Sequence, residues 1–264
     1  MLLPVFLAIV LAAPKIVAAV LFSLMSAIAA YELLHNTGLV KHTRLVIYTC
    51  VTAFLVPLWC HFGMKFVFAQ LGLVTFYALL FMEMMLSHIK LRFDKVAVCF
   101  VAGLLLPYML SNPVRIMNVF SGRYMVLIPF VAAFMGDTGA YFIGRSFGQK
   151  KLAPSISPNK TVEGLIGGIG FGVVSMLLYG VVLQFAFDLK INYLFAVIYG
   201  IVGAVSGAFG DLCFSVIKRQ TGIKDFGNLI PGHGGILDRF DASIVVGCVI
   251  EILIQWIPMV VNNG

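Results

Sequence analysis

Residues 164–187 read GLIGGIGFGVVSMLLYGVVLQFAF, a stretch without a charged side chain. A helix needs about 20 mostly apolar residues to cross the hydrocarbon core of a bilayer. Glycine and other small residues, frequent in the first half of the stretch, let helix backbones approach closely inside a membrane. The stretch is therefore predicted to be a membrane-spanning helix in close contact with a neighbouring helix.

Comparable apolar segments recur along the whole chain. We place them at 2–13, 16–34, 45–60, 66–87, 96–111, 124–143, 162–187, 193–217 and 242–261. The first segment is short for a span, so a re-entrant piece, a tilted piece and the apolar part of a signal peptide are alternatives for it. The pattern predicts an all-α polytopic membrane protein with about 8–9 transmembrane helices.

Composition and charge agree with this class. The chain is 61% hydrophobic and 11% charged, whereas a soluble domain is about 45–50% apolar and about 25% charged. Most of the 18 Lys and Arg residues lie in the loops at 35–44, 88–95, 144–161 and 218–241. Cytoplasmic loops carry such an excess, so we expect these loops to face the cytoplasm. The net charge of +7 then reflects topology and gives no support to nucleic-acid binding.

One aspartate lies inside an apolar segment, in SGAFGDLCFSVIKR (residues 206–219). Ionisable groups at membrane depth are costly and usually functional. On a helix, Asp211, Ser215 and Lys218 would form one stripe at i, i+4 and i+7. Ser206 would lie near this stripe.

A second acidic pair lies in LDRFD (residues 237–241). Asp238 and Asp241 are three residues apart, so both carboxylates can point to one spot if they begin the last helix. A plainer interpretation is that both only stabilise the positive end of the helix dipole.

A third polar element is MGDTGAYFIGRSFGQKKLAPSISPNKTVEG (residues 135–164). Asp137 ends an apolar run there. Ser157 and Pro158 suit a helix start, with serine as the cap and proline at the first helical position. Lys160 would then stand at a helix N-terminus, which favours anions. The alternative is a solvated cytoplasmic loop.

The loop PGHGG (residues 231–235) is rich in glycine. Gly232, Gly234 and Gly235 would let the backbone turn sharply and approach a ligand. His233 could bind a phosphate, bind a metal or act as a structural donor, and without a second histidine nearby we do not predict a zinc site. Outside this region, Glu32, Glu83 and Glu251 are expected to be pairing or interfacial residues rather than catalysts.

Several aspartates at one membrane face suit Mg²⁺, which prefers oxygen ligands and usually bridges to substrate phosphates. Nearby lysines, arginines and glycine backbone suit a polyphosphate. Phosphoryl or nucleotidyl transfer needs mainly positioning and charge neutralisation. These residue types predict a site for two phosphorylated reactants at the membrane boundary.

The run SVIKRQTGIKDFGNLIPGHGGILDRFD (residues 215–241) resembles the signature of the CDP-diacylglycerol synthases, or phosphatidate cytidylyltransferases. The segments GDTGAYFIGRSFG, SPNKTVEG and SGAFGDLCFS also resemble this family, so the likeness covers about residues 130–245. The first hundred residues are similar only in hydropathy and in Glu32.

The resemblance implies transfer of the cytidylyl group of CTP to phosphatidate, giving CDP-diacylglycerol and pyrophosphate, with Mg²⁺ required. It implies a multi-pass protein of a bacterial-type inner (cytoplasmic) membrane, with the active-site loops on the cytoplasmic side. Residues 1–123 would be a scaffold and residues 124–264 the catalytic region. The expected partners are CTP, phosphatidate and membrane lipids, and a homodimer stays open.

The resemblance also implies roles for single residues. Asp211, Asp238 and Asp241 would hold the metal centre, with a second cation such as K⁺ left open, and Lys218 would join them in catalysis. The expected substrate-binding residues are Asp137, Ser157, Asn159, Lys160, Ser206, Ser215, Arg219, Lys224, Gly232, His233, Gly234, Gly235 and Arg239.

Two other functions remain open at this stage. A CTP-dependent lipid kinase such as dolichol kinase, or a synthase acting on archaeal ether lipids, would use similar groups. A membrane transporter is an alternative from another class, because buried aspartates and broken helices are common in transporters. The polar groups gather at one face rather than at the midplane, which favours the enzyme.

Overall fold

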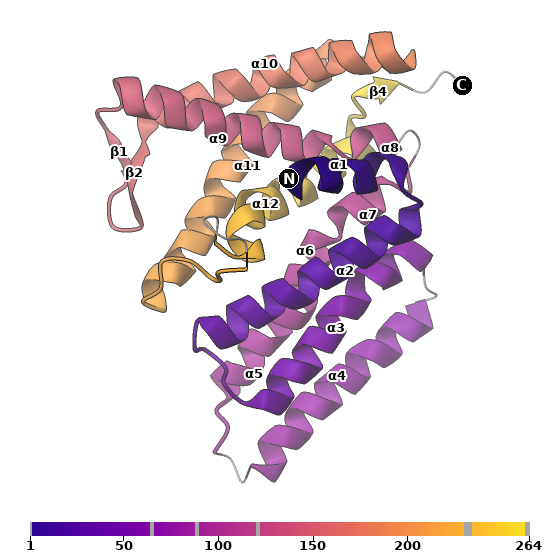
Figure 1. Cartoon of the computed structure of the whole chain (residues 1–264), viewed down its shortest axis with the longest axis vertical. Coiled ribbons are helices and arrows are strands. Elements are labelled where there is room, and N and C mark those ends of the chain that lie inside the picture. The colour runs from indigo at the N-terminus through magenta and orange to yellow at the C-terminus, as the bar shows by residue number, and fades with distance from the viewer. Residues whose placement is uncertain (1, 64–65, 88–89, 120–121, 230–233, 262–264) are drawn as a thin grey trace. The chain divides into compact units, whose positions relative to one another are not determined.

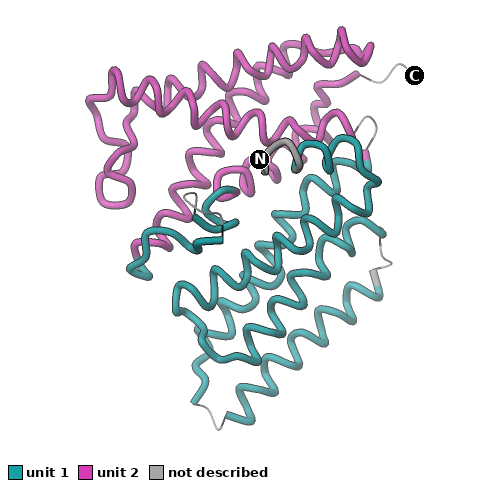
Figure 2. Tube along the Cα trace, viewed as in Figure 1, with its two compact units in different colours: residues 1–118, 220–239 teal, residues 119–219, 240–264 magenta. Residues whose placement is uncertain are grey.

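The computed structural model describes residues 2–63, 66–87, 90–119, 122–229 and 234–261. The chain forms two compact units, coloured separately in Figure 2. Unit 1 comprises residues 1–118 and 220–239, and unit 2 comprises residues 119–219 and 240–264.

The N-terminal part of unit 1, up to residue 118, consists of helices (Figure 1). They are α1 (Leu2–Ala12), α2 (Lys15–Tyr31), the π-helical turn η1 (Glu32–Asn36), α3 (Thr43–Phe62), α4 (Phe66–Leu86), α5 (Phe93–Phe100), the π-helical turn η2 (Val101–Leu105), α6 (Leu106–Leu110) and α7 (Asn112–Ile116). Residues 221–229 and 234–235, which belong to the same unit, contain neither helix nor paired strand apart from an isolated bridge at Gly234.

Helix α2 continues into η1 and then stops at a glycine turn. Its buried residues include Ala18, Ala19 and Phe22, and the helix packs against α3. The Thr37 hydroxyl donates to the Leu33 carbonyl at 2.6 Å. Gly38 follows with a φ of 76°, the left-handed conformation in which helices commonly end. This ending fixes the place of Glu32 and Asn36 in the last turn.

Unit 2 contains long helices and two small hairpins. Its elements are α8 (Gly122–Met125), α9 (Ile128–Phe147), β1 (Lys151–Ala153), β2 (Ser157–Thr161), α10 (Val162–Phe187), β3 (Lys190–Ile191), α11 (Tyr193–Gln220), α12 (Ile236–Trp256) from Phe240 onward, and β4 (Val260–Val261). Strand β1 pairs with β2, and β3 with β4, both antiparallel.

Helices α9 and α10 pack closely through glycines. A Cβ atom added to Gly168 would lie 2.8 Å from the Gly136 carbonyl oxygen, and one added to Gly164 would lie 2.8 Å from the Ala140 carbonyl oxygen. No side chain fits at these distances, so the two backbones are in direct contact. The close approach predicted from the glycine-rich stretch is confirmed.

Seven helical segments of the described residues are long and apolar enough to cross a membrane. They are Lys15–Asn36, Thr43–Phe62, Val67–Leu86, Phe93–Ile116, Gly122–Phe147, Val162–Phe187 and Tyr193–Gln220. The other two predicted segments correspond to α1, with 11 residues, and to α12. The prediction of an all-α, multi-pass membrane protein is confirmed.

The predicted helix start at Ser157 and Pro158 is wrong. Both residues lie in β2, where Ser157 faces Ala153 of β1. A residue before proline favours extended backbone, and pairing with β1 satisfies this preference. Helix α10 begins at Val162 instead, and the hydroxyl of its N-cap, Thr161, accepts a hydrogen bond from the Gly164 N–H at 3.1 Å.

The compact units follow a different division from the predicted scaffold (1–123) and catalytic region (124–264). Residues 220–239, which carry most of the signature, are grouped with the N-terminal helices. The units are defined by contacts rather than by activity, so the functional division stays a prediction.

Candidate active site

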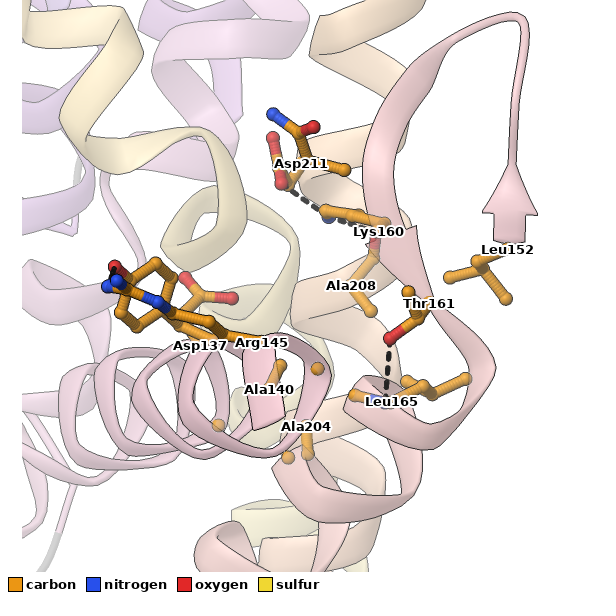
Figure 3. Close-up of a pocket in the computed structure, with 16 residues that line it drawn as sticks. Asp137, Ala140, Arg145, Leu152, Lys160, Thr161, Leu165, Ala204, Ala208 and Asp211 are labelled. Atoms are coloured by element: carbon orange, nitrogen blue, oxygen red, sulfur yellow. Dashed lines mark hydrogen bonds and ion pairs between the residues drawn. The ribbon is translucent and has the colours of Figure 1, made fainter. Parts of the chain in front are cut away.

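The centre of the candidate site in unit 2 is Asp211 on α11. Its carboxylate forms an ion pair with the Lys160 ammonium group of β2, drawn in Figure 3. The two side chains are partly buried, with 23% of Lys160 and 28% of Asp211 exposed. The Ser215 hydroxyl, one turn further along α11, donates to Asp211 Oδ1 at 3.3 Å. The predicted stripe therefore brings Ser215 to Asp211.

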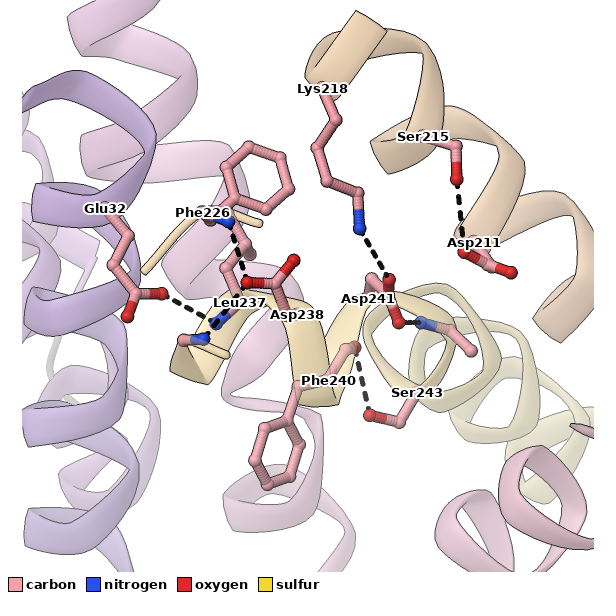
Figure 4. A network of polar contacts seen from close by, with 12 residues as sticks. Glu32, Asp211, Ser215, Lys218, Phe226, Leu237, Asp238, Phe240, Asp241 and Ser243 are labelled. Atoms are coloured by element: carbon pink, nitrogen blue, oxygen red, sulfur yellow. Dashed lines mark hydrogen bonds and ion pairs between the residues drawn. The ribbon is translucent and has the colours of Figure 1, made fainter. Parts of the chain in front are cut away.

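A second carboxylate–lysine pair joins α11 to α12 within unit 2. Lys218 Nζ lies 3.8 Å from Asp241 Oδ2 (Figure 4), and the side chains are 14% and 13% exposed. The Ala242 N–H also donates to Asp241 Oδ1 at 2.8 Å. Asp241 precedes the apolar part of α12. Burial and, to a smaller extent, the nearby charge of Asp211 raise the pKa of the Asp241 carboxyl to about 7.

A pocket of about 470 Å³ opens beside the first of these pairs (Figure 3). Its polar lining residues are Asp137, Tyr141, Arg145, Asn159, Lys160, Thr161 and Asp211. The rest of the wall is made of Leu152, Leu165, three alanines and the glycines of the α9–α10 contact. The pocket thus combines charged groups with apolar side chains and glycines, a combination that suits a ligand with a phosphate and an apolar part.

In unit 1, Asp238 is held by backbone N–H groups (Figure 4). Its Oδ2 atom accepts hydrogen bonds from Phe226 at 2.7 Å and from Gly235 at 3.0 Å. These bonds attach both sides of the signature loop to the first turn of α12. Asp238 therefore has a structural role. The plainer interpretation of the sequence was stabilisation of the helix end, whereas these bonds attach the loop.

Glu32 is the residue whose role near the signature was missed. It is buried, and its two carboxylate oxygens accept the N–H groups of Ile236 and Leu237 at 3.0 and 2.8 Å. Asn36 Nδ2 donates to the Phe226 carbonyl at 2.8 Å. A buried carboxylate in an apolar segment needs partners, and that requirement was the available signal, but the sequence does not say where the partners lie.

The other predicted site residues have varied surroundings. Arg219 is exposed, and its Nε donates to the Ile156 carbonyl at 3.1 Å. The Ser206 hydroxyl donates to the Gly203 carbonyl within its own helix at 3.1 Å. Lys224 and Arg239 are exposed in unit 1.

The predicted glycine loop is only partly described. Gly232 and His233 lie outside the described residues. Gly234 has a φ of 81°, a conformation that favours glycine, and Gly235 is buried. The need for glycine is therefore explained at Gly234, while the role predicted for His233 stays a prediction.

A magnesium ion needs several oxygen ligands around one point. No group of three or more His, Cys, Asp and Glu side chains in the described part of the chain is arranged to hold a metal ion. Asp211 and Asp241 face lysines instead. The donor chemistry nevertheless fits, because Mg²⁺ prefers carboxylate oxygens and would relieve the repulsion that contributes to the raised pKa of Asp241.

A multi-pass helical protein with a lysine- and aspartate-lined pocket belongs to the class of membrane proteins equipped for phosphorylated ligands. Residues 1–257 match the model described as "Cytidylyltransferase family". The chain belongs to the cytidylyltransferase family.

The chain is similar to bacterial proteins named phosphatidate cytidylyltransferase. It is 34% identical to that of Bacillus subtilis over 86% of this chain and 84% of the relative. It is 42% identical to that of Staphylococcus haemolyticus and 44% identical to one of Staphylococcus epidermidis, each over 133 residues. These staphylococcal matches span half of each chain.

Proposed function

We propose that this protein transfers the cytidylyl group of CTP to phosphatidate, producing CDP-diacylglycerol and pyrophosphate. The family and the names of the relatives support this reaction. The observation that carries it is the Asp211–Lys160 pair at the wall of a pocket that is lined by both charged and apolar residues. Such a pocket suits a phosphorylated lipid better than a water-soluble phosphate.

The reaction needs little covalent help from the protein. An oxygen of the lipid phosphate attacks the α-phosphorus of CTP, and the bond from that phosphorus to the β-bridging oxygen breaks as pyrophosphate leaves. A phosphate monoester is largely ionised near neutral pH, so a strong general base is unnecessary. The protein mainly has to hold two anionic reactants together and neutralise their charge.

Asp211 and Asp241 are the carboxylates that we propose for Mg²⁺. Asp238 is proposed with them because it lies three residues before Asp241 on the same helix. When bound, the ion would neutralise charge on the triphosphate and on the departing pyrophosphate. A second cation such as K⁺ would need oxygen ligands of the same kind.

Lys160 and Lys218 would move between two partners. Each pairs with an aspartate, and if the aspartates held a cation, the ammonium groups would be available to phosphate. A lysine ammonium is a compact charge on a flexible stem, so each could turn from carboxylate to phosphate. Arg145 and Asn159 line the same pocket and would add donors for the lipid phosphate.

We also propose that the site faces the cytoplasm of a bacterial-type inner membrane. Lys160 precedes the start of α10, and Lys218 and Lys224 lie at and beyond the end of α11. The start of one spanning helix and the end of the next lie on the same side of a membrane, and these segments have the Lys/Arg excess typical of the cytoplasmic side. CTP would reach such a site from the cytoplasm and phosphatidate from the bilayer. The pocket is lined by one chain, so a homodimer would carry one pocket in each copy.

The test uses purified protein in detergent micelles that contain phosphatidate and CTP labelled on either the α- or the γ-phosphorus. The proposed reaction moves the α-label into lipid and the γ-label into pyrophosphate, and only with Mg²⁺. A lipid kinase would move the γ-label into lipid. Exchange of substrate across proteoliposomes without CTP consumption would favour a transporter.

A further inference from the structure

We propose that Glu32 is a positioning residue for the reaction. It holds the first turn of α12, which carries Asp238 and is followed by Asp241. This inference rests on the proposed function for its link to turnover. The contacts that carry it all lie within unit 1.

Glu32 lies far from α12 in sequence, at the start of η1. It is 2% exposed. Oε1 accepts the Ile236 N–H at 3.0 Å, and Oε2 accepts the Leu237 N–H at 2.8 Å (Figure 4). Both oxygens of one carboxylate are therefore used on two successive backbone groups at the beginning of α12.

These two N–H groups need a partner from elsewhere. The first N–H groups of a helix have no partner inside the helix, and a capping serine, threonine, asparagine or aspartate usually supplies one. Gly235 precedes Ile236, and glycine has no side chain for this purpose. A carboxylate is also favoured at the positive end of the helix dipole, so Glu32 performs the capping from a distant helix.

The glycines around the carboxylate support the same assignment. A Cβ atom added to Gly227 would lie 2.5 Å from Glu32 Oε1, and one added to Gly235 would collide with the same carboxylate. Two loop residues next to Glu32 are thus small enough to let it reach the helix. The contact with Glu32 is by itself a reason for glycine at 235.

Three further bonds connect this cap to the signature loop. Asn36, one turn after Glu32, donates to the Phe226 carbonyl at 2.8 Å. The Phe226 N–H donates to Asp238, as does the Gly235 N–H. The two sides of the loop and the start of α12 are consequently fixed to η1 together. Removing the Glu32 charge should loosen both the loop and the turn that carries Asp238.

The test compares Glu32→Gln with Glu83→Gln in the full-length protein. Glu83 is a matched control because it is a buried glutamate of the same unit, bonded to Arg44 at 3.1 Å and Tyr48 at 3.3 Å. Trypsin cleavage after the exposed Lys224 reports loop opening without any need for catalysis. Production of labelled CDP-lipid gives kcat and the KM for CTP.

We expect Glu32→Gln to speed cleavage after Lys224 about tenfold, since cleavage follows the population of the opened loop and two bonds to a charged group are weakened. We expect kcat to fall about 10²-fold, because small displacements of reacting groups are this costly. Glu83→Gln should change neither quantity by more than about twofold, because its hydrogen-bond partners belong to α3 and not to the loop.

Equal cleavage and equal kcat in Glu32→Gln and wild type would overturn the proposal. So would matching changes in the two variants, since these would reduce Glu32 to a general structural residue. If Glu32→Gln does not fold, Glu32→Asp, which keeps the charge on a shorter arm, is judged by the same two criteria. A wild-type protein that makes no CDP-lipid would refute the proposed function alone, because the cleavage rates still test the attachment of the loop.

Discussion

Two groups of carboxylates in this protein are held in opposite ways. In unit 1, Glu32 and Asp238 accept hydrogen bonds from backbone N–H groups. In unit 2, Asp211 and Asp241 face the ammonium groups of lysines, although Asp241 also accepts the N–H group of the next residue, Ala242. Backbone donors move only if the chain moves, whereas a lysine can swing away and leave the carboxylate open. The first group is thus suited to fixing structure and the second to exchanging partners.

The largest effect should come from the exchangeable group. Asp211→Asn leaves Lys160 without its anionic partner and removes a proposed metal ligand. We expect turnover to fall about 10³-fold, as is usual when a group that stabilises developing charge is lost. The measurement is the rate of labelled CDP-lipid formation at saturating Mg²⁺.

Asp94→Asn is the matched control for this change. Asp94 pairs with Arg92 at 3.2 Å, and its side chain is 58% exposed, so an exposed pair of this kind contributes little. Its turnover should equal that of wild type. Near-normal turnover in Asp211→Asn would refute the assignment of the unit 2 carboxylates to the site.

The next effect concerns the backbone-held group. Gly235→Ala places a Cβ atom against the Glu32 carboxylate, so the cap on α12 must shift. We expect turnover to fall about 10–10²-fold and the melting temperature to fall as well, as measured by kcat and by thermal unfolding in detergent.

Gly170→Ala provides the comparison for glycine replacement. Nothing lies within 4 Å of a Cβ atom at Gly170 in α10, and alanine is favoured over glycine in a helix by about 1 kcal/mol. Its melting temperature should be unchanged or higher. If the two alanine variants behave alike, the contact at Gly235 is unimportant.

Lys160→Ala should have a smaller effect, and it should change the Mg²⁺ requirement and the KM for phosphatidate in opposite directions. Without its ammonium group, Asp211 is more available to a cation, while the pocket is less attractive to an anion. We expect the Mg²⁺ concentration for half-maximal activity to fall and the KM for phosphatidate to rise about tenfold, the usual size for one charge-assisted contact. A titration of each component at saturation of the other separates the two changes.

Lys190→Ala, in the exposed strand β3, removes the same charge away from the pocket and should leave both constants unaltered. A rise in both constants for Lys160→Ala would contradict the exchange of partners, because the lysine would then be needed to hold the metal region together.

The smallest effect should come from Asn36→Ala. This change removes one neutral hydrogen bond, from Asn36 Nδ2 to the Phe226 carbonyl, which contributes about 1 kcal/mol. We expect a slightly lower melting temperature and a turnover within a few-fold of wild type. A loss as large as that expected for Gly235→Ala would mean that Asn36, rather than the charge at Glu32, fixes the loop.

Features with a fixed local period were predictable from the sequence. The segment 162–187 has the same bounds as α10, because length and hydropathy define a spanning helix. Ser215 meets Asp211 because residues four apart share a helix face. Asp238 does lie in the first turn of α12, although part of its role is to hold the loop.

Features that depend on distant partners were not predictable. Ser157 and Pro158 carry a good local signal for a helix start, but pairing with β1 outweighs it. Glu32 meets residues more than two hundred positions later, and periodicity contains no information about such a meeting. The metal ligands, the second cation and the role of His233 stay predictions.

The contact between α9 and α10 has a consequence for which lipids the pocket can accept. Where Gly136, Gly164 and Gly168 line it, the wall consists of main-chain atoms, which have no rotamers to change. Such a surface keeps one contour whatever lies against it. A ligand that rests along this seam must therefore fit the wall, because the wall cannot adapt to the ligand.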